Sequence, residues 1–321
     1  MKSTLQIVEE RSRLNHALRT FFLERQYHEV DTPLLVQSPG MEPNLVPMEV
    51  DLRNELKTSF PAGLITSPEY AMKKLLGLGC KAIFTLTHVF RNEEPWDTTH
   101  NPEFTMLEWY RASADYHACM DETEALVKAV GAAFGKTFPS FQRVRVRDLF
   151  LDATGIDLTS AKKADLDTYC IQEALGWSET DTESDVFYRI FITKVEPFLP
   201  KEPIFVYEYP AHQASLSRLT SDGCFGERFE LYIDGLELCN GFTELTNATE
   251  QRARFLIEAQ ERRDLGKRVF PLDETFLQLL EQVPNPSFGN ALGVDRLHMI
   301  VTDARTIHEV QPFPASDLFQ S

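Results

Sequence analysis

The chain has 321 residues, of which 43% are hydrophobic and 25% are charged. This composition excludes a disordered chain, and no run of 18 apolar residues is long enough for a helical membrane span. The first ten residues include Glu9 and Glu10 and have no continuous apolar segment, which excludes the pattern of a secretory signal. We therefore expect a soluble, globular protein of the cytoplasm.

Charge and cysteine content narrow the function classes further. Lysine and arginine number 32 against 49 acidic residues, for a net charge of −17 at pH 7, so a large basic face for nucleic acid is not expected. The five cysteines are odd in number and form no C-x-x-C pair, which excludes a disulfide scaffold and a zinc ribbon. We expect each cysteine to be a small buried hydrophobic residue.

The N-terminal segment predicts a helix followed by a strand. Ser3 and Gln6 can form a capping box, and apolar residues recur at helical spacing after them, so residues 4–26 are predicted to form an amphipathic helix. Residues 29–36 are predicted to form a strand. Pro33 lacks a backbone donor and therefore belongs at a sheet edge or a strand start.

The middle of the chain predicts a long hairpin and several helices. Residues 82–93 and 103–111 are β-rich runs on either side of a polar loop. Residues 114–135 are predicted to form a helix. Residues 140–200 have a mixed, mostly helical pattern and carry no recognisable chemistry.

A second hairpin is predicted at Asp234-Gly235, which separates two alternating runs. A two-residue turn there pairs Tyr232 with Glu237. Glu230 and Glu237 then become diagonal neighbours on one face of the sheet, with Cα atoms roughly 7–8 Å apart. We therefore expect two carboxylates to converge on that face.

The C-terminal third predicts two more helices and completes the fold class. One helix is expected to begin at Asn247 and end at Gly266, and residues 291–301 are expected to be a strand or turn that runs into a buried helix. No repeat of 20 to 50 residues divides the chain. We expect an α+β domain with a mostly antiparallel sheet flanked by helices.

Three groups of polar residues occur on these elements. The groups are Arg91-Asn92-Glu93 with His100, Asn101, Phe104, Glu108 and Tyr110; Gly293 with Arg296; and Glu230, Glu237, Asn240, Phe242 and Glu244. An arginine at a helix start can hold a phosphate or pair with a carboxylate. Clustered carboxylates without basic neighbours need cations, such as Mg²⁺ beside a polyphosphate or an amine-bearing ligand. Each group alone is also compatible with an ordinary charged surface.

Together, in order and spacing, the three groups resemble the signature motifs of class II aminoacyl-tRNA synthetases. The segments RNEEPWDTTHNPEFTMLEWY and GLELCNGFTEL are similar to the lysine branch of that class, and the resemblance covers essentially the whole chain. It implies ATP and Mg²⁺ as cofactors, with Arg91 on the α-phosphate and Arg296 on the γ-phosphate as the catalytic pair. It also implies adenine between Phe104 and Arg296, and Mg²⁺ on Glu230 and Glu237.

The resemblance implies the remaining contacts as well. The other residues expected to line the nucleotide are Asn92, Glu93, His100, Asn101, Leu238 and Gly293. The residues expected to bind the amino acid are Arg91 and Asn240 on its carboxylate, with Ser67, Pro68, Glu69, Glu108, Tyr110, Phe242, Glu244 and Ala291 around its amines and backbone. A substrate with two ammonium groups suits a pocket that holds more carboxylates than arginines.

The alternation of the 236–244 segment raises a geometric difficulty. Asn240 and Glu244 have the opposite strand parity to Glu237, so a flat strand cannot present all three side chains on one face. We expect a bend or bulge near Gly241.

Two departures separate this chain from lysyl-tRNA synthetases. The first-motif helix begins at once, so we expect one catalytic domain over residues 1–321 and no N-terminal anticodon-binding domain. Ala291 stands where those enzymes have glycine, and its methyl group disfavours an α-amino acid. Both features, with the QASL run at 213–216, resemble the truncated paralogue of these enzymes that attaches (R)-β-lysine to a lysine of elongation factor P. This resemblance implies an amide-forming ligase and a homodimer, with elongation factor P rather than tRNA as the acceptor.

Two alternatives stay open. The chain could instead be a minimal tRNA or amino-acid ligase, which the identity of the acceptor separates from the first interpretation. A catalytically inactive synthetase-like regulatory subunit is the other alternative. Such a subunit is expected to lose the charged residues of the ATP site, whereas Arg91, Glu237 and Arg296 are all present.

Overall fold

The computed structural model describes residues 2–319. Its strands are β1 (His28–Glu29), β2 (Leu35–Val36), β3 (Glu49–Arg53), β4 (Ser59–Leu64), β5 (Ala82–Phe90), β6 (Glu103–Ala112), β7 (Gln142–Arg145), β8 (Ile204–Tyr207), β9 (Arg228–Ile233), β10 (Leu236–Thr243) and β11 (Ser287–Gly293). Its α-helices are α1 (Thr4–Glu24), α2 (Glu69–Gly77), α3 (Tyr116–Ala133), α4 (Val146–Thr154), α5 (Lys163–Gln172), α6 (Glu183–Ile190), α7 (Ala248–Asp264), α8 (Glu274–Leu280), α9 (Val294–Thr302) and α10 (Ala315–Leu318).

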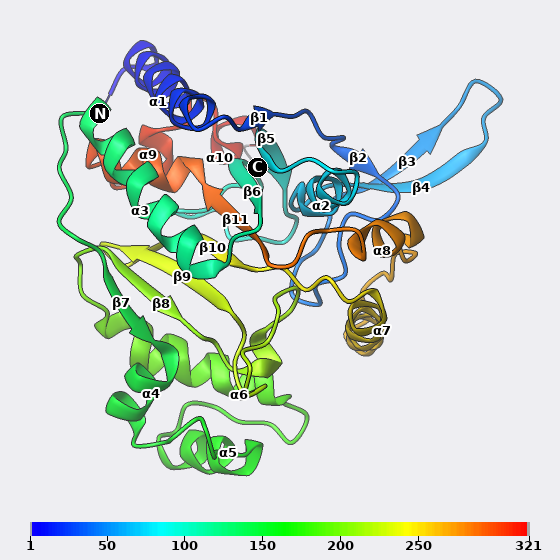
Figure 1. Cartoon of the computed structure of the whole chain (residues 1–321), viewed down its shortest axis with the longest axis vertical. Coiled ribbons are helices and arrows are strands. Elements are labelled where there is room, and N and C mark those ends of the chain that lie inside the picture. Colours follow the sequence, from blue (N-terminus) through cyan, green and yellow to red (C-terminus); the bar gives the residue numbers. More distant parts are fainter. Residues whose placement is uncertain (1, 320–321) are drawn as a thin grey trace.

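An eight-stranded sheet forms the centre of the molecule, with strand order β1-β5-β6-β11-β10-β9-β8-β7 (Figure 1). The five inner pairs are antiparallel, and only the outermost pairs, β1 with β5 and β7 with β8, are parallel. A small second sheet has the order β2-β4-β3, and its β3–β4 hairpin projects from the body in Figure 1. The predicted α+β class with a mostly antiparallel sheet is confirmed.

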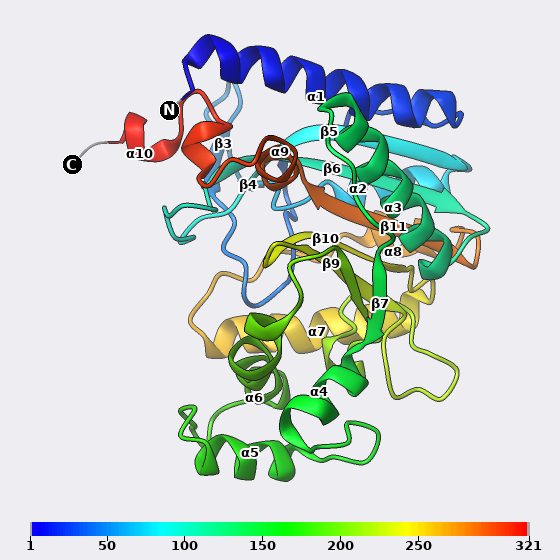
Figure 2. The ribbon, with the colours of Figure 1, turned by 90° about the vertical axis from the view of Figure 1, so that its left-hand side faces the viewer.

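Helices cover both faces of the large sheet (Figure 2). On one face, α1, α3 and α9 pack on the strands through a continuous hydrophobic cluster that includes Phe22, Trp109, Met120 and Leu297. On the other face, α2, α7 and α8 share a second cluster, and α4 to α6 form a third beneath β8 and β9. Burial on both sides fixes which face each strand residue occupies.

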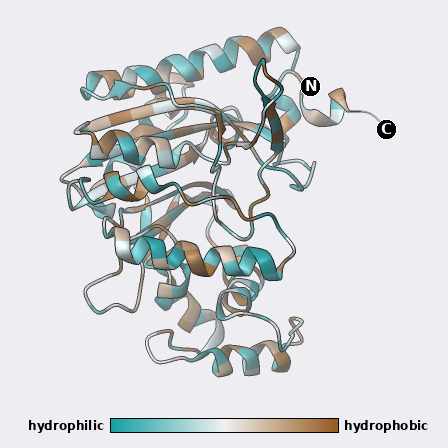
Figure 3. Cartoon of the chain, turned by 90° about the vertical axis from the view of Figure 1, so that its right-hand side faces the viewer, coloured by the Kyte–Doolittle hydropathy of each residue, from teal (hydrophilic) through white to brown (hydrophobic). Residues whose placement is uncertain are grey.

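The N-terminal helix is confirmed, but the strand predicted after it is wrong. Gln6 and Ser3 form the expected capping box, and Figure 3 shows hydrophilic and hydrophobic residues mixed along α1. Within residues 29–36, only short segments pair, and they belong to different sheets: β1 to the large sheet and β2 to the small one. Pro33 lies between them, where its missing N–H removes a ladder bond.

Both predicted hairpins are confirmed. β5 pairs with β6 from Ala82 to Phe90, and β9 pairs with β10 across the Asp234-Gly235 turn, with Tyr232 opposite Glu237. The predicted helices at 114–135 and 247–266 correspond to α3 and α7, and residues 291–301 run from β11 into α9 as expected. Asn247 caps α7 by accepting from the N–H of Glu250, at 3.0 Å.

The cysteine prediction is partly wrong. Cys119, Cys170 and Cys239 are buried as expected, but Cys80 is half-buried and Cys224 is exposed on the loop before β9. None of the five is in a disulfide. Over residues 2–319, no helix has the length and apolarity to cross a membrane.

Candidate active site

The residues singled out from the sequence gather on one face of the central strands. In the ladder, Ala291 of β11 lies between Glu108 of β6 and Asn240 of β10. Side chains two residues apart share a face, so Tyr110 and Phe242 lie beside them. This face is opposite the one packed against α1, α3 and α9.

A β-bulge in β10 brings the two halves of the strand onto this same face. Glu237 pairs with Tyr232, but Asn240 pairs with Glu230, because the register shifts between Glu237 and Cys239. The predicted irregularity therefore exists, but the predicted place was wrong: it lies at Leu238 rather than near Gly241. The extra residue reverses the parity, so Glu237 points to the same side as Asn240 and the later residues of the strand.

Three carboxylates form one end of the site: Glu108 and Glu244 are buried, and Glu69 is partly buried. Glu108 is 1% exposed and accepts hydrogen bonds from Ser67 Oγ, at 2.5 Å, and from the Tyr110 hydroxyl, at 2.9 Å. Burial and the nearby Glu69 carboxylate raise the pKa of Glu108 to about 8. Glu244 is fully buried, and burial raises its pKa to about 8 as well, although Lys73 lowers it.

Lys73, which was not identified from the sequence, lies among these carboxylates. Its Nζ is 2.6 Å from Glu69 Oε1 and 2.6 Å from Glu244 Oε2, and the residue is 1% exposed. Burial disfavours its charge, yet Glu244 and Glu69 outweigh burial and raise the pKa of Lys73. The one sequence signal was its position four residues after Glu69, on the same side of α2.

The other end of the site is positive. Arg91 follows directly after β5, and its guanidinium lies 5.2 Å from the ring centroid of Phe104. Its Nε is buried and has no hydrogen-bond partner within residues 2–319, and burial lowers the pKa of Arg91. A buried arginine with an unused donor suits an anionic ligand.

Glu93 does not share a strand face with Arg91, because β5 ends at Phe90. It has a φ of 59° and is exposed, so the β-rich run predicted over residues 82–93 extends three residues too far. Asn92 is also exposed, and its backbone N–H donates to Val46 O at 2.7 Å.

Arg296 connects α9 to the start of β10. It donates to the backbone oxygen of Glu237 at 2.8 Å, and its other nitrogen lies 2.9 Å from His100 Nε2. Its guanidinium is 4.0 Å from the Glu237 carboxylate. The partly buried position of Glu237, and next the charge of Glu230, raise the pKa of Glu237 to about 7.

Asn101 is engaged within the chain. Its Nδ2 donates to Glu103 O at 2.5 Å, and its Oδ1 accepts from the N–H of Ala315 at 2.8 Å. The amide therefore ties the loop between β5 and β6 to α10. Gly293 ends β11, where an added Cβ would lie 3.8 Å from Leu238 O, so the two residues adjoin.

Glu230 has basic and hydroxyl partners, which corrects the expectation of carboxylates without basic neighbours. Its carboxylate lies 2.5 Å from Arg228 and accepts from the Tyr209 and Tyr232 hydroxyls, both at 2.6 Å. Arg228 also donates to Asn240 Oδ1 at 3.2 Å. Neither Arg228 nor Tyr209 was identified from the sequence. Across residues 2–319, no three His, Cys, Asp or Glu side chains are grouped to hold a metal.

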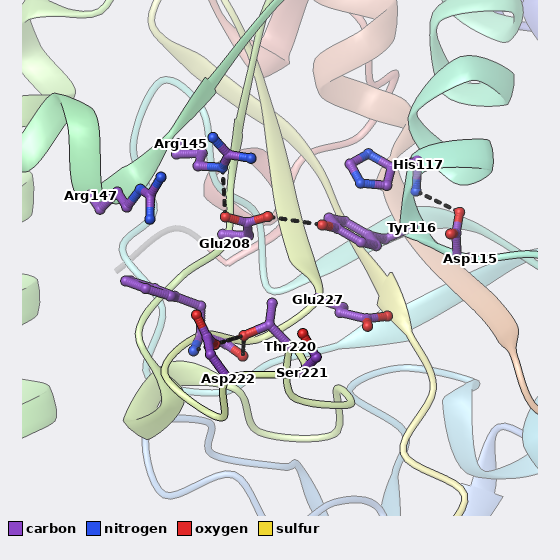
Figure 4. A pocket seen from close by; sticks show the side chains of 11 residues that line it. Asp115, Tyr116, His117, Arg145, Arg147, Glu208, Thr220, Ser221, Asp222 and Glu227 are labelled. Atoms are coloured by element: carbon purple, nitrogen blue, oxygen red, sulfur yellow. Dashed lines mark hydrogen bonds and ion pairs between the residues drawn. The ribbon is translucent and has the colours of Figure 1, made fainter. Parts of the chain in front are cut away.

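A second hollow, drawn in Figure 4, lies on the α3 side of β7 and β8. Its charged groups are largely paired: Arg145 contacts Glu208 at 2.8 Å, and the Tyr116 hydroxyl donates to the same carboxylate at 3.0 Å. None of the residues predicted to bind a ligand lines this hollow. The candidate active site is therefore on the opposite face of the sheet.

The sequence profile of the family described as tRNA synthetases class II (D, K and N) matches residues 1–317. The chain therefore belongs to the class II tRNA synthetase family.

Three of its curated relatives are named elongation factor P–(R)-β-lysine ligase. The proteins from Hamiltonella defensa subsp. Acyrthosiphon pisum (strain 5AT), Edwardsiella ictaluri (strain 93-146) and Pasteurella multocida (strain Pm70) are 38%, 39% and 40% identical to the chain. The matches cover 92%, 95% and 94% of this chain and 91%, 93% and 93% of the respective relatives.

Proposed function

We propose that the protein activates (R)-β-lysine with ATP and transfers it to a lysine side chain of elongation factor P. The observation that carries this proposal is the pairing, on one sheet face, of a buried pocket with three carboxylates and a region with two arginines. The names of the three relatives support the same activity. The charged residues at the carboxylate end and at the arginine end of the site are all present, which argues against a catalytically inactive subunit.

Amino-acid activation needs a carboxylate to attack the α-phosphate of ATP, which displaces pyrophosphate and gives an aminoacyl adenylate. We propose that Arg91 orients both the attacking carboxylate and the phosphate, and that Arg296 holds the leaving pyrophosphate. Stabilising the charge that develops in this displacement, and holding the reactants in line, supplies most of the rate enhancement. No nucleophilic side chain is required.

Phe104 offers a ring face for adenine, and Gly293 leaves space beside Leu238. His100, Asn92, Glu93 and the backbone of Asn101 are proposed to complete the nucleotide site. Arg91 lies near the Phe104 ring, so adenine between Phe104 and Arg296 would require these side chains to move.

Mg²⁺ fits at Glu237. This carboxylate is half-buried beside Glu230, and a divalent cation there would relieve the repulsion between them. Mg²⁺ typically takes one or two carboxylates together with substrate phosphates. Because Glu230 is held by Arg228 and two tyrosines, we propose Glu237 as the principal protein ligand, with Glu230 behind it. The ion would neutralise phosphate charge during the displacement.

The carboxylate pocket suits the side chain and amines of the amino acid. Glu69, Glu108 and Glu244 face a single lysine, Lys73, so two ammonium groups from the substrate would balance the charge. Ser67, Pro68, Tyr110 and Phe242 shape the pocket around them, and Asn240 is proposed to contact the substrate carboxylate with Arg91.

Substrate binding should release protons near neutral pH. The pKa of Glu108 is raised to about 8, so this carboxyl is largely protonated at pH 7, whereas an ammonium ligand favours its ionised form. We expect binding of β-lysine at pH 7 to release about one proton, and binding at pH 9 to release almost none. Calorimetry in buffers with different ionisation enthalpies measures this number. Equal release at both pH values would contradict the proposed contacts.

The acceptor distinguishes this proposal from a minimal tRNA ligase. The ε-amine of the acceptor lysine attacks the adenylate carbonyl, an amide bond forms, and AMP leaves, while a carboxylate or phosphate takes the proton. The net charge of −17 supports a protein acceptor, because it offers few phosphate contacts for tRNA.

We therefore expect labelled β-lysine to accumulate on purified elongation factor P as an amide that withstands mild alkali. Total tRNA, incubated in parallel, should gain no label. Label on tRNA that mild alkali removes, with none on the factor, would favour the tRNA ligase instead. Mass spectrometry of the labelled factor identifies the modified lysine.

Ala291 is proposed to select the β-amino acid. It is half-buried between Asn240 and Glu108, so its methyl group adjoins the region assigned to the substrate backbone. One methyl group provides steric discrimination of about 10- to 200-fold. Ala291→Gly should therefore narrow the preference for β-lysine over α-lysine, measured as the ratio of kcat/KM values in pyrophosphate exchange. An unchanged ratio would place the selectivity elsewhere.

We also propose that the protein works as a homodimer in the cytoplasm. Five cysteines outside any disulfide suit a reducing compartment. The exposed apolar residues Leu5 and Val8 of α1 suit a subunit contact. Light scattering coupled to size-exclusion chromatography tests the oligomeric state.

A further inference from the structure

Glu42 lies between β2 and β3. Its backbone oxygen accepts a hydrogen bond, whereas its carboxylate Oε2 accepts none within the described chain. Arg262 donates to the carbonyl oxygen of Glu42 at 2.8 Å and to that of Leu45 at 2.9 Å. The side chain turns back over Gly40: a Cβ at Gly40 would lie 2.5 Å from Glu42 Oε2 and 3.2 Å from Thr66 Oγ1. Glu42 therefore reaches the segment that carries Ser67 and Glu69.

The Oε2 atom of Glu42 is buried without a hydrogen-bond partner in the described part of the chain. Arg262 does not serve it, because that guanidinium donates to the carbonyl oxygens of Arg268, Glu42 and Leu45. Burial, and next the charge of Glu69, raise the pKa of Glu42, while Arg91 and Arg262 lower it. Glu42 thus lies within electrostatic reach of both the carboxylate pocket and Arg91.

A buried carboxylate oxygen without a partner is costly to the folded state, and such groups call for a ligand. Lys73 already occupies Glu69 Oε1, so Glu69 has only part of its capacity left for a substrate amine. The ammonium group nearest the substrate carboxylate would lie between Arg91 and Glu69. The charges of both residues act on Glu42.

We propose that Glu42 is a specificity-determining residue of the amino-acid site, where its free oxygen and Glu69 together bind the ammonium group nearest the substrate carboxylate. This inference rests on the proposed function. It adds a residue to the amino-acid pocket and assigns it to one of the two amines.

The test compares wild type with Glu42→Gln, which keeps the shape of the side chain and removes its charge. Two ligands are used: β-lysine as substrate, and 6-aminohexanoate, which lacks the amine near the carboxylate, as a competitive inhibitor. We expect the KM for β-lysine to rise about ten- to a hundredfold, as for the loss of a charge-assisted hydrogen bond. The inhibition constant of 6-aminohexanoate and the KM for ATP should stay unchanged.

Glu258→Gln is the matched control. Glu258 lies on α7 within electrostatic reach of Glu42, and burial and then Glu42 raise its pKa to about 8. Both substitutions should leave the thermal midpoint of the unliganded protein unchanged or higher, because each removes a buried acidic group. Only Glu42→Gln should weaken β-lysine binding.

The outcomes separate this inference from the proposed function. Wild-type exchange with β-lysine, combined with an unchanged KM in Glu42→Gln, overturns the role of Glu42 alone. Equal losses for β-lysine and 6-aminohexanoate, or an equal effect of Glu258→Gln, or a lowered thermal midpoint in Glu42→Gln, also overturn it. Absence of exchange by the wild type would overturn both proposals.

Discussion

Replacing Arg91 with alanine is expected to lower β-lysine-dependent exchange between pyrophosphate and ATP by at least about a hundredfold. Loss of a buried, charge-assisted contact to the transition state typically costs about 3 kcal/mol or more. Arg91 is the residue with a buried, unused donor at the positive end of the site, within the described chain. The same loss is expected for Arg296→Ala, which also breaks the contact between α9 and β10.

Two further variants make this test specific. Arg91→Lys keeps the charge but removes the planar pair of donors, so its exchange rate should fall between those of wild type and Arg91→Ala. Arg143, which pairs with Asp121 at the opposite edge of the sheet, is the control, and Arg143→Ala should exchange at the wild-type rate. Near-normal exchange by Arg91→Ala would remove Arg91 from the catalytic site.

Lys73→Met is expected to have the largest effect on stability. It leaves Glu69 and Glu244 without their shared cation, and removing one partner of a buried ion pair typically costs about 3–5 kcal/mol. The folded-state pKa of Glu244, already raised to about 8, should then lie further above its unfolded value. The stability that its protonation contributes is therefore lost progressively as pH rises from about 4.5 through 8, and the variant should be less stable at pH 8 than at pH 6.

Lys74→Met is the control on the same helix. Lys74 pairs with Asp273, and both side chains are partly exposed, so its loss should cost under about 1 kcal/mol. Urea denaturation of both variants at the two pH values measures the difference. If Lys73→Met and Lys74→Met were equally stable at pH 8, the buried cation would not be the main support of the pocket.

Much of the fold was predictable because local patterns and burial agree. The Asp234-Gly235 turn fixes its hairpin, and the capping residues fix the starts of α1 and α7. The prediction of one strand over residues 29–36 was wrong because the sequence of a short extended segment does not indicate with which sheet each of its ends pairs. Pro33 marked an interruption, and tertiary pairing decided the rest.

Part of the site was also predictable, since strand parity places Glu108 and Tyr110 on one face and the family resemblance implied Ala291 beside the same substrate. Lys73, Arg228 and Glu42 were missed for a different reason. The role of each residue depends on contacts with elements distant in sequence, or on the lack of a hydrogen-bond partner. The sequence alone shows neither of these two features. The site of the bulge was likewise hidden, because Leu238 is an ordinary strand residue and only the register with β9 reveals the extra position.

The bulge at Leu238 also makes the length of β10 matter as much as its composition. Deleting one residue after the bulge, such as Gly241, would shift the alternation and turn Phe242 and Glu244 toward the helices, even though both side chains would still be encoded. Substitutions in the site therefore leave the faces of β10 unchanged, whereas a single-codon deletion after the bulge would exchange the inner and outer faces of the rest of the strand.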